Sequence, residues 1–198
     1  MMKQLILATK NAGKVYEFKQ IMQNHPFEII SLLDISYPTE IEETGTTFEE
    51  NALIKAREIA SLYKTVVVAD DSGLEIDALN GAPGVYSARY AGVVSDDDAN
   101  IKKVLTELEN VAPHERKARF VCILAMVDEK GHETVVRGTC EGEILDERRG
   151  DNGFGYDPIF YLSEHKRTMA ELSDDEKNSL SHRGNAFRKL EKIIGEQL

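Results

Sequence analysis

The stretch LILATKNAGKVYEF, residues 5–18, joins an apolar run to a polar turn and then to an amphipathic segment. At first sight it is a Walker-type P-loop, which requires Gly, four residues, Gly-Lys and then Ser or Thr. Gly13 and Lys14 are in place. However, Ala8 stands where the first Gly belongs, and Val15 stands where the hydroxyl belongs. The stretch therefore predicts a strand, a loop and a helix that lack the P-loop ligand for Mg²⁺.

The same stretch begins a strand, helix, strand unit. We expect, in order, a strand, a polar turn and a helix opened by Lys14, at residues 4–8, 9–13 and 14–24. The start of a helix presents backbone N–H groups and a positive dipole to an anion, so the turn suits a phosphate. The run FEIISL, residues 27–32, predicts the next strand. Units of this kind build sheets with helices on their faces.

Length and composition indicate one globular domain over residues 1–198. The chain has 41% hydrophobic and 30% charged residues, and neither a repeat nor a Pro- or Gly-rich linker divides it. These proportions are ordinary for a folded protein of this size. No apolar run reaches the roughly 18 residues of a transmembrane helix, and the first residues carry no secretion signal. We therefore expect a cytoplasmic protein with no membrane partner.

The charge balance narrows the class of ligand. The formal net charge is −11, which disfavours nonspecific binding to nucleic acid or to an anionic membrane, because both reward Lys and Arg. A small anionic ligand is compatible with this charge if cations gather locally or a metal ion assists. An RNA-binding role is the least favoured interpretation.

Two cysteines, Cys122 and Cys140, are too few for a zinc cluster or a disulfide framework. They lie symmetrically about Gly131, in two β-rich runs that read as a hairpin, so they could be cross-strand neighbours. A cytosolic setting nevertheless favours reduced thiols over a disulfide.

The rest of the chain reads as alternating helices and strands. Capping boxes, in which Ser or Thr precedes an acid by three residues, predict helix starts at Thr47, Ser95 and Ser173. The expected elements are a helix at residues 47–63, a strand, an Asp-Asp-Ser-Gly turn and a short strand within 65–79, a Gly-rich loop at 80–92, a helix at 95–111, a long hairpin within 117–145 turning near Lys130, a loop and short strand at 148–162, and a helical segment at 171–197 with a break near His182 and Gly184. The hairpin makes the expected sheet mixed.

Asp70 and Asp71 end an apolar run beside a Gly-containing turn. Asp is common in turns because its side chain bonds nearby backbone N–H groups, so a purely structural role is one interpretation. The other interpretation is that a cation binds there, because charge at the end of a buried strand is unfavourable unless a cation balances it. A magnesium ion would supply that balance.

Two acidic pairs offer the oxygen ligands that Mg²⁺ prefers. Glu42 and Glu43 come from one loop, and Asp70 and Asp71 from another. Metal held by these acids would explain the missing P-loop hydroxyl, although Glu42 and Glu43 could equally be a solvated acidic loop.

The segment GFGYDP, residues 153–158, is suited to enclosing a base. Its glycines let the backbone approach a ligand, Phe154 and Tyr156 can stack on a ring, and Asp157 can accept hydrogen bonds. The alternative is a Gly-rich turn with a core aromatic. The cations Lys14, Lys55, Lys177, His182 and Arg183 could likewise bind anions or solvate a helix face.

Seven motifs occur in order: TKNAGK, EETG, FEENALIKA, ADDSGL, GAPGVYSARYAG, GFGYDPIF and ELSDDEKNSLSHRG. Together they resemble the inosine triphosphate pyrophosphatase family, and they span nearly the whole chain. The resemblance implies a mixed α/β fold with two lobes around a long central sheet, a nucleotide cleft between the lobes, and a homodimer. It also implies Mg²⁺-dependent hydrolysis of ITP, dITP and XTP to the monophosphate and pyrophosphate, which keeps these nucleotides out of DNA and RNA.

The resemblance also assigns roles to residues. Phosphate contacts would come from the loop and two lysines, namely Thr9, Lys10, Asn11, Ala12, Gly13, Lys14 and Lys55. Glu42 and Asp71 would hold the metal, and Asp71 would also accept the proton of the attacking water. The remaining substrate contacts would be Ser72, Phe154, Gly155, Tyr156, Asp157, Lys177, His182 and Arg183. Lys10 occupies a variable loop position, and Asp70 stands where some relatives carry Glu.

Two other functions remain open at this point. A related pyrophosphatase could use the same phosphate contacts on modified pyrimidine or methylated nucleotides. A regulatory module could bind a nucleotide without turnover, although it has little need of carboxylates beside phosphates.

Overall fold

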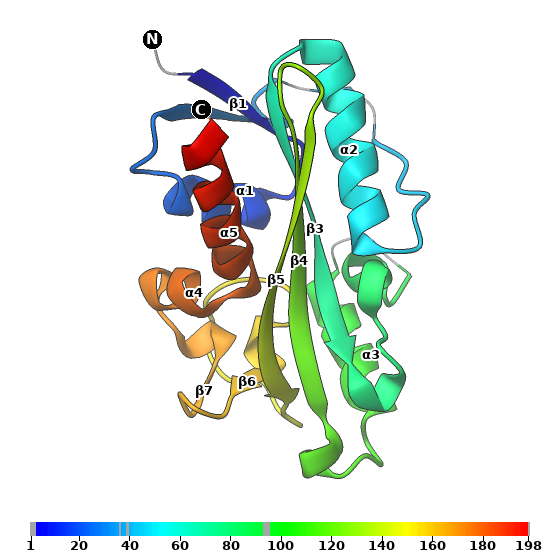
Figure 1. Cartoon of the computed structure of the whole chain (residues 1–198). Coiled ribbons are helices and arrows are strands. Elements are labelled where there is room, and N and C mark those ends of the chain that lie inside the picture. Colours follow the sequence, from blue (N-terminus) through cyan, green and yellow to red (C-terminus); the bar gives the residue numbers. More distant parts are fainter. Residues whose placement is uncertain (1–2, 36, 39, 93–95, 198) are drawn as a thin grey trace. The chain divides into compact units, whose positions relative to one another are not determined.

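The computed structural model describes residues 3–35, 37–38, 40–92 and 96–197 (Figure 1). It contains a mixed sheet with the strand order β2-β1-β3-β4-β5-β6-β7. The strands are β1 Lys3–Leu7, β2 Phe27–Ser31, β3 Val66–Ile76, β4 Lys117–Val127, β5 Glu133–Ile144, β6 Phe160–Leu162 and β7 Arg167–Thr168. The α-helices are α1 Ala12–Ile21, α2 Phe48–Tyr63, α3 Asp97–Glu107, α4 Asp174–Leu180 and α5 His182–Gln197. The prediction of a mixed sheet with flanking helices is confirmed.

The chain divides into two compact units. The first comprises Met1–Asp71, Cys122–Gly138 and Ala186–Leu198, and the second comprises Ser72–Val121 and Thr139–Asn185. Strands β3, β4 and β5 contribute residues to both units. No helix among the described residues is long and apolar enough to cross a membrane.

In the first unit, β1 pairs in parallel with both β2 and β3. Leu5 lies opposite Ile29 on one side and Val66 on the other. Parallel neighbours need a crossover connection, and α1 supplies it between β1 and β2. The predicted strand, helix, strand unit is therefore confirmed.

Both faces of these strands are covered. Leu5 and Leu7 belong to an apolar cluster with residues of α1 and α5, including Phe18 and Phe187. Ile6, which points to the opposite face, is also buried. Figure 1 shows α1 and α5 on one side of the strands and α2 on the other. Strands that are buried on both faces have continuous apolar sequences, and β1 has such a sequence.

Helix α1 begins two residues earlier than the sequence predicts. Asn11 is its N-cap, and the Asn11 side chain accepts a hydrogen bond from the Lys14 backbone N–H. The cap places Ala12 and Gly13 in the first turn, so Lys14 does not open the helix. The spacing of Val15, Phe18 and Met22 predicts that they share one face of the helix, and all three are buried.

Helix α2 follows its prediction closely. Thr47 caps it with a complete capping box to Glu50. Of the residues expected toward the core, the structure buries Phe48, Ala52, Ala56 and Ile59 and leaves Leu53 and Ala60 half-buried.

Strand β3 corrects the prediction of a turn at Asp70 and Asp71. The backbone is a single strand from Val66 to Ile76, and both acids lie inside it. Asp and Gly are depleted in strands, which is why this segment reads as a turn. Basic side chains from other elements compensate the two acids, as described below.

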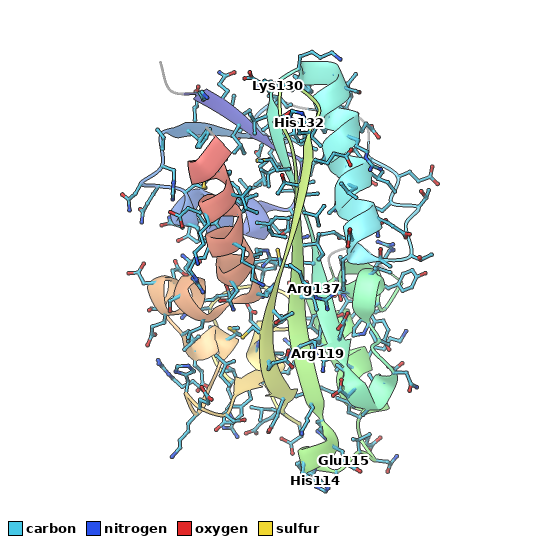
Figure 2. All side chains as sticks on the ribbon, viewed as in Figure 1. His114, Glu115, Arg119, Lys130, His132 and Arg137 are labelled. Carbon is cyan, nitrogen blue, oxygen red and sulfur yellow. The ribbon has the colours of Figure 1, made fainter. Side chains whose placement is uncertain are left out.

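Strands β4 and β5 form the predicted hairpin, whose turn is closed by a bond from the Asp128 N–H to the His132 carbonyl (Figure 2). Cys122 and Cys140 are both thiols and form no disulfide. They belong to different apolar clusters, one in each unit. The preference for reduced thiols is confirmed, and the suggestion that they are cross-strand neighbours stays a prediction.

The second unit has its own apolar cluster, built around α3 and the adjacent strand segments. Arg119 of β4 forms ion pairs with Glu75 of β3, Asp77 and Glu141 of β5 (Figure 2). Antiparallel β6 and β7 complete this part of the sheet.

Three local predictions in the second unit have different outcomes. Helix α3 is capped by Asp96, and the predicted cap Ser95 lies outside the described residues. Helix α4 has the predicted capping box at Ser173, and the chain breaks before α5 at Ser181. The expected Gly-rich loop contains one short 3₁₀ helix, η2. The 3₁₀ helices of the chain are η1 Asp77–Leu79, η2 Gly84–Arg89, η3 Pro113–Glu115, η4 Asp157–Ile159 and η5 Met169–Glu171.

Candidate active site

Asp70 lies in the interior of the first unit and is 3% exposed. The Lys14 Nζ of α1 is 2.5 Å from its Oδ1, and the Cys122 thiol of β4 donates to its Oδ2 at 3.3 Å. A buried carboxylate requires such compensation. Lys14 is thus paired with an acid of β3.

Lys55 of α2 is the second buried cation. Its Nζ lies 2.6 Å from Glu43 Oε1, donates to the Asp70 carbonyl at 2.9 Å and lies 3.4 Å from Asp71 Oδ1. Burial alone would lower the pKa of Lys55, but the charges of Asp71 and Glu43 outweigh burial and raise it. Lys55 is therefore held as a cation against the acids of the site.

Asp71 carries an unsatisfied oxygen. Its Oδ2 is buried and has no hydrogen-bond partner within the part of the chain that the structure describes. Burial raises the pKa of the Asp71 carboxyl, and the charges of Lys55 and Lys14 oppose the rise. A buried acceptor of this kind is unfavourable unless a ligand, water or ion meets it. Asp71 is therefore equipped to bind a cation or to accept a proton.

The acids partly fit the predicted metal site. Within residues 3–35, 37–38, 40–92 and 96–197, no group of three or more His, Cys, Asp or Glu side chains could hold a metal by itself. Mg²⁺ commonly uses only one or two carboxylates and takes its other ligands from water and phosphates. The Asp71 Oδ2 suits one such position, and the exposed Glu42 is available for another. Glu43 instead pairs with Lys55.

The loop before α1 is ordered by its own side chains. Thr9 Oγ1 accepts a bond from the Asn11 N–H at 3.1 Å, and Asn11 Oδ1 accepts from the Lys14 N–H at 3.0 Å. These side chains position the backbone, while the amides of Ala12 and Gly13 lie in a first helical turn, which offers no internal acceptors. Lys10 is exposed, with its Nζ 5.8 Å from the Tyr37 ring centroid.

In the second unit, Phe154 lies beside two cations. Lys177 Nζ is 5.0 Å and the Arg183 guanidinium carbon 5.2 Å from the centroid of its ring. Lys177 also forms a buried ion pair with Asp157 at 2.5 Å, and Asp157 accepts a bond from the Phe154 N–H at 3.0 Å. Asp157 therefore accepts hydrogen bonds, but the donors are groups of the protein itself.

Arg183 and His182 begin α5. Arg183 donates to the Ser72 hydroxyl at 2.8 Å, and the His182 ring stacks on Phe120 with centroids 4.8 Å apart. Ser72 directly follows Asp71 in β3.

Tyr156 is buried in the apolar cluster of the second unit, and its hydroxyl donates to the Ser87 carbonyl at 2.8 Å. The Tyr156 ring thus packs in the core, and its hydroxyl bonds a backbone carbonyl of the protein. This is the core aromatic that the sequence left as an alternative, and we expect Tyr156 to support its loop rather than to stack on a base.

Two side chains that hold loops of the candidate site escaped the sequence reasoning. The Asn51 side chain accepts from the Gly45 N–H at 2.8 Å and so fixes the loop that carries Glu42. The Asp97 side chain accepts from the Gly155 N–H at 2.7 Å. Each acts on a distant backbone amide, and no spacing in the sequence signals such a bond.

Comparisons with known proteins show which family the chain belongs to. The model of the Ham1 family matches residues 5–193. The chain is 58% identical to a dITP/XTP pyrophosphatase of Bacillus anthracis, over 98% of each chain. It is 54% identical to a dITP/XTP pyrophosphatase of Bacillus subtilis, again over 98% of each. The solved Staphylococcus aureus Ham1 protein matches with a TM-score of 0.88 and 44% identity, covering 99% of this chain and 100% of that one.

These matches extend over nearly the full length, and they include sequence and structure independently. The resemblance drawn from the seven motifs is confirmed, and the chain belongs to the Ham1 family.

Proposed function

We propose that this chain is a nucleoside triphosphate pyrophosphatase that hydrolyses the non-standard purine nucleotides ITP, dITP and XTP, thereby clearing them from the nucleotide pool. The observation that carries the proposal is the buried Asp71, with an unsatisfied Oδ2 and two lysines around its strand. The printed names of the Bacillus relatives, dITP/XTP pyrophosphatase, support the substrate class.

The reaction requires water to attack the α-phosphorus while the bond to the β-phosphate bridging oxygen breaks. The products are the nucleoside monophosphate and pyrophosphate. Charge on the phosphate oxygens must be neutralised for this step. We assign that task to Lys14, Lys55 and the backbone amides at the start of α1, which favour anions. The two lysines would exchange carboxylate partners for phosphate oxygens when the nucleotide binds.

Asp71 would take the proton from the attacking water. Its raised pKa makes it a better proton acceptor than an ordinary carboxylate. Mg²⁺, held by Asp71 and Glu42, would supply neutralisation of phosphate charge and a lower pKa for bound water. Glu43 would keep Lys55 beside Asp71, since it forms the shorter of the two Lys55 ion pairs.

Base recognition would fall to the second unit. The ring of Phe154 can stack on a purine, and the donors of Lys177, His182 and Arg183 can meet the 6-keto oxygen that adenine lacks. A site built on hydrogen bonds rejects a mismatched base because buried polar groups are left unpaired. We further propose a homodimer acting in the cytoplasm, as the family resemblance implies.

A pyrophosphate-release assay with Mg²⁺ tests the proposal. ITP and XTP should be turned over much faster than ATP, GTP, dTTP or UTP. Preference for dTTP or UTP would favour the pyrimidine pyrophosphatase, and tight binding without turnover would favour a nucleotide sensor.

The matched variant is Asp71→Asn, which removes the charge but keeps the shape. We expect at least about a hundredfold loss of turnover, since general-base assistance contributes roughly 10²–10⁴. Nucleotide binding, measured by calorimetry without turnover, should persist. Near wild-type pyrophosphate release by this variant would exclude the role given to Asp71.

A further inference from the structure

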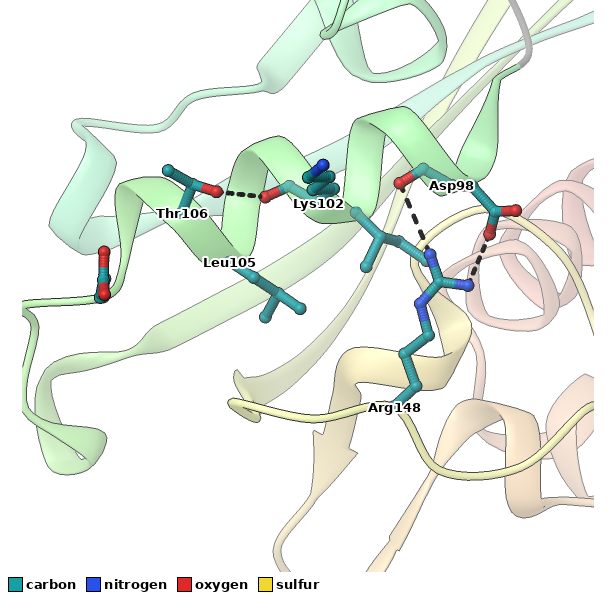
Figure 3. A pocket seen from close by; sticks show the side chains of 7 residues that line it. Asp98, Lys102, Leu105, Thr106 and Arg148 are labelled. Atoms are coloured by element: carbon teal, nitrogen blue, oxygen red, sulfur yellow. Dashed lines mark hydrogen bonds and ion pairs between the residues drawn. The ribbon is translucent and has the colours of Figure 1, made fainter.

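Two neighbouring acids at the start of α3 hold the loop that leads to Phe154. Asp98 bonds the Arg148 guanidinium at 2.5 Å, as Figure 3 shows at the edge of a surface pocket. Asp97 accepts from the Gly155 N–H at 2.7 Å. The loop is therefore tied to one helix turn near both of its ends.

The two ties differ in character. The Asp98 side chain is 84% exposed and that of Arg148 44%, and exposed ion pairs contribute little because water and salt screen them. Asp97 is half-buried and binds a backbone amide of fixed direction. A carboxylate that accepts from an N–H group forms one of the stronger types of hydrogen bond.

The Asp97 bond controls the orientation of a short turn. The amides of Phe154 and Gly155 are consecutive, and each donates to a carboxylate, that of Asp157 and that of Asp97 respectively. Gly155 has φ +62°. Because glycine has no Cβ and adopts either sign of φ readily, steric repulsion does little to hold the backbone in this conformation. The two bonds together fix the plane of this turn and hence the direction of the Phe154 ring.

The middle of the loop has separate anchors. The Asn152 N–H donates to the Ala170 carbonyl at 3.1 Å, and the Asn152 side chain donates to the Leu172 carbonyl at 3.0 Å. Loss of Asp97 would therefore release only the turn at Phe154 and Gly155. The remainder of the loop would stay in place.

We propose that Asp97 is a positioning residue for base recognition, acting through the Gly155 amide to hold Phe154 in its stacking position. The inference rests on the proposed function, which makes Phe154 part of the base site. Asp97 would touch neither the base nor the reacting phosphates. Its effect should appear in substrate affinity and base selectivity rather than in the chemical step.

The test compares Asp97→Ala, Asp97→Asn and Asp98→Ala. Both Ala variants remove one acid from the first turn of α3, so they share any effect on the helix dipole. We expect Asp97→Ala to raise KM for ITP by about tenfold with kcat within about twofold, as loss of one charge-assisted hydrogen bond implies. Its preference for ITP over ATP should fall, because a displaced base presents its 6-keto oxygen less well to the donors of the site. Asp97→Asn keeps an acceptor oxygen and should recover most of the affinity, and Asp98→Ala should match the wild type.

An activity-independent measurement accompanies the kinetics. Amide hydrogen exchange at Gly155 should be faster in Asp97→Ala than in Asp98→Ala, whether or not ITP is the substrate. If wild type fails to hydrolyse ITP while this difference is present, the proposed function fails and the tie at Gly155 stands. Equal exchange in the two Ala variants would overturn the inference. A loss confined to kcat, or an equal rise in KM for both variants, would also overturn it.

Discussion

Asp70 is a charged residue inside a strand that begins with three valines, and the Lys14 side chain balances its charge. From the sequence, Lys14 is predicted to contact phosphate, so that its loss would weaken nucleotide binding and leave metal binding by the carboxylates largely intact. The structure adds a second task, because removing one partner of a buried ion pair leaves the other charge uncompensated.

We therefore predict that Lys14→Met lowers the free energy of unfolding by about 3 kcal/mol. The double variant Lys14→Met, Asp70→Asn should recover most of this loss, since no uncompensated charge remains. Nucleotide binding should be weak in both. Urea unfolding and nucleotide calorimetry measure the two effects, and a double variant as unstable as the single one would show that the pair has no such coupling.

Asp34 gives a prediction about pH. Hydrogen bonds from the Ser31 backbone and hydroxyl, followed by the Lys19 side chain, lower its pKa to about 2. Because the folded pKa is below the unfolded value, the stabilisation is present above about pH 4 and is lost as pH falls toward 2. Asp34→Asn cannot titrate, so its unfolding free energy should change less than that of wild type across this window.

The control for this experiment is Asp146→Asn, which changes an exposed acid. Urea unfolding at several pH values between 5 and 2 provides the comparison. If Asp34→Asn and Asp146→Asn follow the same pH profile, the bonds of Asp34 contribute no pH-dependent stability.

At the scale of the elements, helix starts were predictable from sequence because a capping box is a local interaction. Thr47 and Ser173 both cap their helices as predicted. Strand β3 was not predictable in the same way. Its continuity through Asp70 and Asp71 depends on Lys14 and on a second lysine brought by other elements, which a local pattern does not contain.

The candidate site shows the same division. The acids, lysines and Phe154 could be named from motifs, because each motif carries the residue type that its chemistry needs. The residues that pair with them in the fold could not be named from motifs. The pairing of Glu43 with Lys55, and of Asp97 with Gly155, joins segments that only the folded chain brings together.

The cap of α2 can be tested directly. Thr47→Ala removes the bond that Thr47 Oγ1 accepts from the Glu50 N–H and should lower the unfolding free energy by about 1 kcal/mol. Thr47→Ser keeps the hydroxyl and should lower it by much less. Urea unfolding compares the three proteins, and equal stability of Thr47→Ala and wild type would mean that the cap adds nothing in this context.

For the whole molecule, the chain divides into two units with separate apolar clusters, yet β3, β4 and β5 run through both. We expect these shared strands to couple unfolding of the two units into one transition. Leu124 of the first cluster and Leu108 of the second are both fully buried, so they form a matched pair.

Leu124→Ala and Leu108→Ala should each lower the stability of that single transition by about 2–5 kcal/mol, the usual range for such truncations. Calorimetry and circular dichroism at several wavelengths provide the measurement. Two transitions, with each variant moving only one of them, would show that the units unfold independently.

The two cysteines allow the opening of each unit to be followed by chemical labelling. Cys122 is wholly inaccessible in one cluster, and Cys140 is 9% exposed in the other, where burial raises the pKa of its thiol to about 12. Thiolates rather than thiols react with alkylating reagents, so both positions should remain unmodified until their surroundings open. The native chain therefore carries one built-in reporter in each unit, and mass spectrometry of pulse-alkylated protein would time the opening of each without an added probe.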